Sequence, residues 1–200
     1  MKTIFKLALI VITTAALFGC GTTAKRIAQM SQSDKADVFA EVKGDEPIPK
    51  GFVGLIIRAN IKTHVEGYYI LESKESQHGK QSYPFLVNID GQAVRWEVNG
   101  IRDSKPKYDK DGTSRDPEAG EGMKYAIDRK LRLRVGSHKV FFGLPEDSYS
   151  TEVKITLTEG ARHVLEFKPI YRTKRIPTRI PTFLQGIVRY EVVLDSVKVN

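Results

Sequence analysis

An alternation of apolar and polar side chains with a period of two recurs through residues 52–200, and it constrains the fold more than any other feature of the chain. Its clearest instance is the segment 83–98, which has Asp90-Gly91 at its centre. An Asp-Gly pair between alternating segments is typical of a β-hairpin with a two-residue turn. The opposed residues are then Ile89/Gln92, Val87/Val94, Phe85/Trp96 and Tyr83/Val98. One face of this hairpin is nearly all apolar, which predicts that register and a buried Trp96.

The same pattern predicts further strands at residues 52–62 and 68–71 and a last strand that continues to Val199. In the last strand Val188, Tyr190, Val192 and Leu194 should face inward. Two more hairpins are expected. A turn at Gly136-Ser137 would oppose Leu133 to Val140 and Leu131 to Phe142. A three-residue loop at 158–160, with Gly160 left-handed, would oppose Leu157/Ala161, Ile155/His163 and Val153/Leu165.

No segment after residue 52 shows the 3.6-residue period of an amphipathic helix. Seven to nine short strands at this spacing predict an all-β fold, a single antiparallel β-sandwich over residues 51–200. The hydrophobic fraction of 40% is sufficient for its core. The polar stretch 100–124 is expected to be a loop inserted between the strands of this domain.

The first nineteen residues have the layout of a secretory signal. Lys2 and Lys6 precede an apolar run over residues 7–12, which is too short to serve as a durable membrane span. We therefore expect export and removal of residues 1–19. Two lysines and no acid leave with them, so the net charge falls from +8 to +6.

This signal ends in Leu17-Phe18-Gly19-Cys20, which resembles the lipobox of bacterial lipoproteins. The resemblance implies cleavage before Cys20, diacylation of its thiol and usually a third acyl chain on the new amino terminus. Phe18 departs from the small or β-branched residue common there, and an ordinary signal peptide cut elsewhere is the alternative. Gly21 resembles the residue that directs Gram-negative lipoproteins to the outer membrane. We therefore expect a lipid-anchored protein of the cell envelope, at the outer membrane in a Gram-negative host.

Cys20 is the only cysteine of the chain, so stability must come from packing rather than from disulfides. Residues 20–50 are small and polar and are expected to form a flexible tether after the lipidated Cys20, with a short helix over residues 24–30 as the alternative. A basic chain in the cytoplasm would suggest nucleic acid as the partner. Export removes that partner and leaves anionic lipid head groups, acidic glycans or another envelope protein.

A second resemblance rests on the run from Leu133 to Pro169. It contains an Arg-Val-Gly-Ser-His-Lys-Val turn over residues 134–140 and the segment Val-Lys-Ile-Thr-Leu-Thr-Glu-Gly-Ala-Arg-His-Val-Leu-Glu-Phe over residues 153–167. It resembles the PEGA-type and related transthyretin-like modules of bacterial envelope proteins, in which a Gly-x-His or Gly-x-Tyr turn precedes a strand pair. The resemblance covers less than a quarter of the chain and implies a fold and an adaptor role without catalytic residues.

The polar segment 100–124 contains a candidate calcium loop. When Gly112 is aligned with the glycine of an EF-hand loop, its third, fifth and twelfth positions are Asp109, Asp111 and Glu118. Clustered carboxylates suit calcium, which takes about six to eight oxygen ligands. Lys107 stands where the first ligand should be, so a solvated cluster of Asp/Gly turns is the alternative.

Residues 168–182, which we term the basic strap, contain five positive charges and no acid. Arg175-Ile-Pro-Thr repeats at once as Arg179-Ile-Pro-Thr, and prolines four residues apart forbid a helix interior and a central strand. We expect an extended arm in which Arg172, Lys174, Arg175 and Arg179 contact an anionic surface or a partner. The alternative is a plain crossover between two strands with solvated arginines.

Four histidines remain, and they lack a close ligand spacing and a cysteine partner. They are His64, His78, His138 and His163. His138 lies beside a turn and His163 faces inward, where a hydrogen-bonded core imidazole is the commoner outcome. The sequence has no nucleophile elbow, P-loop or dinucleotide fingerprint, so we expect no enzyme activity, no cofactor and no metal site.

These observations predict a membrane-anchored, non-enzymatic adaptor or assembly component of the cell envelope. Its partner would be another envelope protein or an anionic polymer, not nucleic acid. A calcium- or carbohydrate-binding module that uses residues 100–124 is the alternative function, and a hydrolase with an unrecognised site ranks below both.

Overall fold

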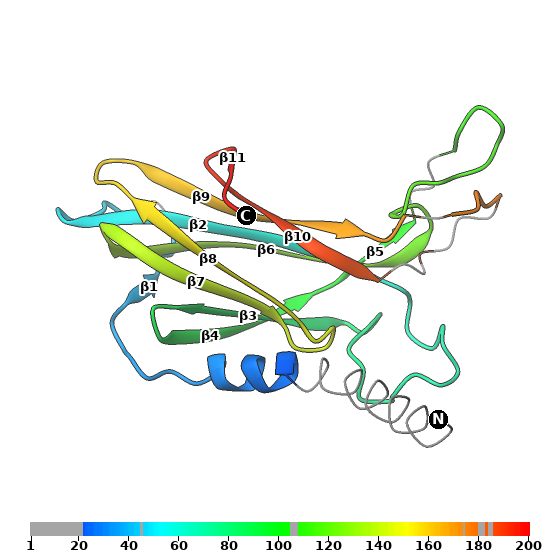
Figure 1. The fold of residues 1–200 in the computed structure, drawn as a ribbon, viewed down its shortest axis with the longest axis horizontal. Helices are drawn as coiled ribbons and strands as arrows, with labels where there is room; N and C mark the ends of the chain where they lie inside the picture. The colour runs from blue at the N-terminus through cyan, green and yellow to red at the C-terminus, as the bar shows by residue number, and fades with distance from the viewer. Residues whose placement is uncertain (1–21, 45, 105–107, 174, 180–182, 184–185) are drawn as a thin grey trace, which may run out of the picture.

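The computed structural model describes residues 22–44, 46–104, 108–173, 175–179, 183 and 186–200. These residues form eleven strands, preceded by one short helix over residues 22–30 (Figure 1). The strands are β1 (Phe39–Glu41), β2 (Phe52–Thr63), β3 (Ser82–Ile89), β4 (Gln92–Asn99), β5 (Ile101–Ser104), β6 (Glu121–Arg134), β7 (Gly136–Leu144), β8 (Tyr149–Leu157), β9 (Arg162–Tyr171), β10 (Ile187–Leu194) and β11 (Val197–Lys198).

The strands form two sheets that pack on each other. The larger sheet has seven strands in the order β1-β6-β2-β9-β10-β11, with β5 also paired to β6, and the smaller has the order β4-β3-β7-β8. Phe142 of the smaller sheet stacks on Phe167 of the larger one, with ring centroids 4.3 Å apart. One core cluster contains the inward residues of both sheets. This mostly β fold is consistent with the predicted β-sandwich.

Two details of the predicted fold class are wrong. The described chain has eleven strands rather than seven to nine. The sheets are also not purely antiparallel, because β2 and β9 pair in parallel, with Gly54 opposite Arg162 and Ala59 opposite Phe167. A parallel pair requires a long crossover connection, and about a hundred residues separate these two strands.

The hairpin of β3 and β4 has the predicted register. Phe85 lies opposite Trp96, and the other three predicted pairs are also observed. Asp90 and Gly91 both have positive φ, as a two-residue hairpin turn requires. Trp96 is 5% exposed, which confirms that it belongs to the core, and its indole N–H donates a 2.6 Å hydrogen bond to the Glu41 carboxylate.

The predicted hairpin at Gly136-Ser137 is wrong, because β6 and β7 belong to different sheets. The chain turns the corner between the sheets there, and His138 Nε2 lies 2.8 Å from the Arg134 carbonyl across that corner. Leu133 and Val140 are both fully buried, but they face the core from opposite sheets. The alternation correctly identified which side chains point inward and could not show which strands are paired.

The predicted hairpin at residues 158–160 is wrong for the same reason. β8 pairs with β7 in the smaller sheet, whereas β9 pairs with β2 and β10 in the larger one. Gly160 does adopt the predicted left-handed conformation, with φ of 80°. Ile155 and His163 are both buried, from opposite sides of the core.

Two smaller strand predictions also fail. Residues 68–71 form turns, and Ile70 and Leu71 are 97% and 98% exposed. In β10, Tyr190 and Val192 are buried as predicted, but Val188 is 52% exposed. The last strand does not continue to the end of the chain either, because the chain reverses at Asp195-Ser196 and β11 pairs back on β10.

The predicted flexible tether at residues 20–50 is wrong for residues 22–41. The helix over residues 22–30 buries Ile27 against Leu86 and Phe141 on the outer face of the smaller sheet. β1 then adds to the edge of the larger sheet, with Phe39 opposite Leu133. A few apolar residues in a polar segment are enough to dock it, because the sandwich offers an apolar patch and an open strand edge.

The polar insertion predicted at residues 100–124 is shorter than expected. β5 pairs with the first residues of β6, with Ile101 opposite Lys124, so the irregular part of the described chain is residues 108–120. Gly100 allows the chain to pass from the smaller to the larger sheet, since a Cβ there would lie 2.5 Å from the Tyr125 ring. We name residues 108–120 the polar loop.

The burial of Trp96 can be tested by truncation. Trp96→Ala should lower the free energy of unfolding by about 3–5 kcal/mol, because it leaves a large cavity opposite Phe85. It also removes the bond that ties Glu41 of β1 to the smaller sheet. Urea denaturation measures this change. Arg95→Ala on the exposed face of the same strand should alter stability by no more than about 0.5 kcal/mol. Equal effects of the two substitutions would place Trp96 on the surface.

Candidate functional site

The connection between β2 and β3, residues 64–80, brings together side chains that are distant in the sequence. We term it the histidine loop. It is closed at its base by a hydrogen bond of 2.9 Å from the Gly79 N–H to the Thr63 hydroxyl. Gly79 has φ of 73°, and a Cβ there would lie 1.9 Å from the Glu66 nitrogen, so only glycine fits this closure. The closure places His78 beside His64, with ring centroids 5.1 Å apart.

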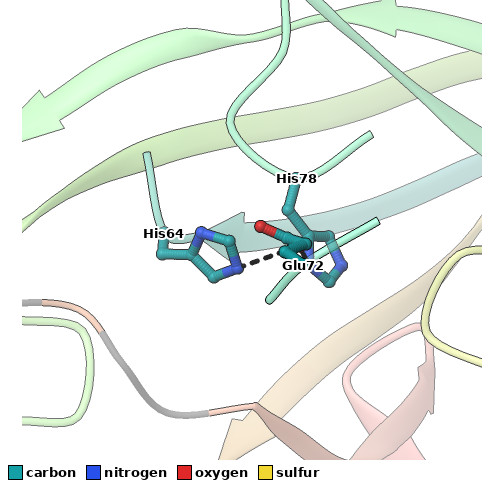
Figure 2. Close-up of side chains that lie close together, drawn as sticks. All are labelled: His64, Glu72 and His78. Carbon is teal, nitrogen blue, oxygen red and sulfur yellow. Dashed lines mark hydrogen bonds and ion pairs between the residues drawn. The ribbon is translucent and has the colours of Figure 1, made fainter. Parts of the chain in front are cut away.

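Glu72 lies between these two imidazoles. Its Oε1 atom is 3.3 Å from His64 Nε2 and 3.1 Å from His78 Nδ1, and it also accepts a 2.8 Å hydrogen bond from the Ser76 hydroxyl. Figure 2 shows the His64 ring directed at Glu72. The three ligand atoms lie within 4.8 Å of one another. Among the described residues, this is the one group of three His, Cys, Asp or Glu side chains that is so close.

The outer nitrogens of both rings also face oxygen atoms. His64 Nδ1 lies 2.9 Å from the Val65 carbonyl oxygen. His78 Nε2 lies 3.4 Å from the carboxylate of Asp147, which follows β7, and the Tyr83 hydroxyl donates to that same carboxylate. The cluster is sheltered, since the side chains of His64 and His78 are 10% and 21% exposed.

The electrostatics of the cluster follow from this arrangement. Burial lowers the pKa of His78, but the Asp147 and Glu72 carboxylates outweigh that effect and raise the pKa above its ordinary value. Burial and the Asp147 charge raise the pKa of the Tyr83 phenol far above its ordinary range, so Tyr83 remains a hydrogen-bond donor. Two imidazoles that converge on one carboxylate can hold either a proton or a cation.

A second buried polar cluster surrounds Lys62, whose side chain is 1% exposed. Its ammonium lies 3.1 Å from the Asp103 carboxylate and donates to the carbonyls of Glu118 and Gly120 at 2.8 and 2.7 Å. It also lies 5.6 Å from the centroid of the Phe183 ring. Lys62 therefore fastens the end of the polar loop and one residue of the region after β9 to the larger sheet. The alternation in the sequence had placed Lys62 on the solvent side.

The residues predicted to bind calcium are not gathered closely in the described structure. The set Asp109, Asp111 and Glu118 is not among the close groups of ligand side chains in the described residues. The Asp111 carboxylate instead accepts bonds from the backbone and hydroxyl of Thr113, which lower its pKa. The Asp111 contacts are those of the Asp/Gly turns that the sequence offered as the alternative, and a calcium loop at these residues stays a prediction.

The basic strap has its arginines on the surface. Arg172, Arg175 and Arg179 are exposed, whereas Lys174 lies outside the described residues, as does Cys20. The first four residues of the segment, 168–171, belong to β9. Beyond them, Thr178 forms an isolated antiparallel bridge with Ser114 of the polar loop, with N–H···O distances of 2.9 and 3.1 Å.

The other two histidines are core residues, as the sequence predicts. His138 lies 2.7 Å from the Asp90 carboxylate, and His163 lies 2.5 Å from that of Asp195. Both residues are 8% exposed. No pattern in the sequence predicted that His64 and His78 would be close together. They are fourteen positions apart, and the hydrogen bond that closes the loop at Gly79 brings them side by side.

Comparison of the chain with family models, with curated proteins and with solved structures yields no match. In the part of the chain that the structure describes, no helix combines the length and the apolar character that crossing a membrane would require.

Replacing Lys62 tests how the polar loop is held. Lys62→Met should lower the free energy of unfolding by about 3 kcal/mol, because it leaves Asp103 and two carbonyls without their buried partner. The matched control is Lys124→Met on the neighbouring strand, where the lysine lies opposite Lys62 but is exposed. Thermal denaturation should show a large shift for the first variant and almost none for the second. Equal shifts of the melting temperature in the two variants would show that Lys62 does not hold the polar loop to the larger sheet.

Proposed function

We propose that this protein is a bacterial lipoprotein that is anchored through an acylated Cys20 and acts as a non-enzymatic binding or assembly module of the cell envelope. The lipobox-like end of the signal supports the anchor, and Gly21 favours the outer membrane in a Gram-negative host. Residue 22, two positions after Cys20, already belongs to the described helix, so the anchor would hold the sandwich close to the bilayer. The resemblance of residues 133–169 to PEGA-type modules supports an adaptor role.

The observation that carries the binding role is the way the basic strap is held. It is fixed to the polar loop through Thr178, and Phe183, the residue after the strap, is 2% exposed and packs edge-on against the Tyr171 ring at 5.3 Å. Three arginines remain on its surface, at positions 172, 175 and 179. A basic segment that is held at several points loses less entropy when it binds than a free one, and it attracts anionic groups over a distance.

The position of the strap favours a partner other than the lipids of the anchoring membrane. In Figure 1 the described part of the strap projects beside the polar loop at the right-hand end of the sandwich, whereas the helix that follows the anchor lies along the lower face. Because the two lie on different sides, we expect the strap to contact an anionic polymer or an acidic envelope protein.

Replacing the acylated cysteine tests the anchor. Two or three acyl chains give stable attachment, since each buried methylene contributes about 0.8 kcal/mol. Cys20→Ser should therefore yield a protein that leaves the membrane fraction or stays as an unprocessed precursor. Fractionation, together with the mass of the mature amino-terminal peptide, measures both outcomes. Membrane attachment and mass like those of the wild type would disprove lipidation.

Neutralising the basic strap tests the binding surface. Replacement of Arg172, Lys174, Arg175 and Arg179 by Gln should weaken binding to isolated envelopes about tenfold or more at low salt, with little change in stability. Added salt should weaken wild-type binding in the same way, because it shortens the Debye length to about 10 Å or less. Sedimentation of the detergent-purified full chain with envelopes measures both effects.

The matched control neutralises four exposed lysines elsewhere, Lys35, Lys43, Lys50 and Lys154. It makes the same change in net charge and should leave most of the binding intact. Equal losses in the two variants would show that net charge alone attracts the envelope, and unchanged binding of the strap variant would reduce the strap to a crossover between β9 and β10.

A further inference from the structure

The first imidazole of the histidine loop lacks a hydrogen-bonding partner of the right kind. A carbonyl oxygen can only accept, so the 2.9 Å contact with Val65 places a proton on His64 Nδ1. In neutral His64 the other nitrogen, Nε2, then carries a lone pair. That lone pair faces Glu72 Oε1 at 3.3 Å, and a carboxylate is also an acceptor. Two acceptors cannot bond, so either a proton on Nε2 or a metal ion has to lie between these atoms.

His78 has the same deficit. Its Nδ1 lies 3.1 Å from Glu72 Oε1 and its Nε2 lies 3.4 Å from Asp147 Oδ1, so both nitrogens face carboxylates. A neutral imidazole carries one N–H, and one nitrogen must therefore direct a lone pair at an acid. In the described structure Nδ1 has hydrogen-bond geometry toward Glu72, whereas Nε2 lies near Asp147 without it. A metal ion on Nδ1 would require the proton to move to Nε2, on the side of Asp147, and the Nδ1 lone pair would then point toward the same place as those of His64 Nε2 and Glu72.

We propose that His64 Nε2, Glu72 Oε1 and His78 Nδ1 bind one divalent transition-metal ion, with Zn²⁺ as the ion that suits them best. One ion would accept all three lone pairs. Ligands held about 2.0–2.1 Å from a tetrahedral Zn²⁺ lie about 3.3 Å from one another. The two distances from Glu72 Oε1, 3.3 Å to His64 Nε2 and 3.1 Å to His78 Nδ1, are close to this ligand–ligand distance. The distance between the two histidine nitrogens is within 4.8 Å, and rotation of the imidazole rings would shorten it when the ion binds.

The outer contacts are those of a metal-binding histidine pair. Ligating imidazoles donate their other N–H to a carbonyl or a carboxylate, and here Val65 and Asp147 supply these acceptors. The Tyr83 hydroxyl in turn holds Asp147. The charges also balance, because two neutral imidazoles and the carboxylates of Glu72 and Asp147 carry two negative charges, which a divalent cation neutralises.

The ligand set also selects the class of ion. Two imidazoles and one carboxylate suit Zn²⁺ and its neighbours Cu²⁺, Ni²⁺ and Fe²⁺, whereas Ca²⁺ and Mg²⁺ prefer oxygen ligands alone. Three protein ligands leave one position for water or for a group from a partner. Two of the three ligands, Glu72 and His78, also line a surface hollow together with Tyr69, Ser73 and Lys80. This site is independent of the lipid anchor and of the basic strap.

Zinc titration of the full chain in detergent, after removal of metals with EDTA, tests the proposal. Calorimetry should show one Zn²⁺ per chain, and Co²⁺ should give the intense visible absorption of a four- or five-coordinate ion. His64→Gln, Glu72→Gln and His78→Gln should each weaken binding about a hundredfold or more. Asp147→Asn should weaken it about 10–100-fold through the orientation of His78.

The controls are His138→Gln and His163→Gln, which remove buried histidines that also pair with an aspartate, and they should bind Zn²⁺ like the wild type. Glu72→Gln supplies an N–H to the facing lone pairs, so it should fold without metal, as circular dichroism can verify. Imidazole ¹⁵N shifts of the wild type give a second measurement, and Zn²⁺ should move His64 and His78 alone. Absence of wild-type binding, affinity within threefold in His64→Gln and Glu72→Gln, or shifts at His138 or His163 instead would overturn the site.

Discussion

The pairing of β2 along both of its edges is the constraint on which the other parts of the structure depend. β6 pairs with it over all twelve residues, and β9 pairs with it in parallel from Gly54 to Ala59. From Gly54 to Ala59 both edges of its backbone are therefore paired inside the larger sheet. Beyond Ala59, β6 continues the pairing along one edge, and the Tyr171 hydroxyl accepts the Lys62 N–H at 2.7 Å, so the end of the strand is also held. Lys62 and His64 project from this end, and each organises one of the two polar clusters.

These two clusters show opposite balances of donors and acceptors. Lys62 has three donors and finds a carboxylate and two carbonyls within 3.1 Å, so its buried charge is satisfied by the protein alone. His64 and His78 meet acceptors at all four ring nitrogens. Buried polar groups are normally paired, so a cluster with an excess of acceptors requires a positive charge, which a proton or a bound metal ion would supply. This difference is why we assign a structural role to Lys62 and a metal to the histidines.

The sequence predicted the fold where contacts are local, and it failed where they are distant. The register at Phe85 and Trp96 followed from an Asp-Gly turn, because turn and facing residues lie within sixteen positions. Leu133 and Val140 are inward in either arrangement, so alternation cannot distinguish a hairpin from a corner between sheets. The histidine cluster depends on a loop closure that produces no periodic pattern in the sequence, so it could not be predicted. The exposed arginines of the strap could be predicted, because they stand in a run of positive charges. The spacing of carboxylates in the polar loop also suited a turn, and in the structure Asp111 accepts two hydrogen bonds from Thr113.

A surface that binds by charge has to be held in place by something other than charge. The arginines of the basic strap contribute nothing to the core, and two prolines alone would not fix their direction. That direction depends on Thr178, which bridges to Ser114, and on Phe183, which lies against Tyr171 and Lys62. Lys62 holds the polar loop as well, so one buried ammonium orders both elements that carry the strap. The proposed binding surface is therefore attached to the core at the end of β2, and we expect its affinity to depend on packing as well as on its net charge.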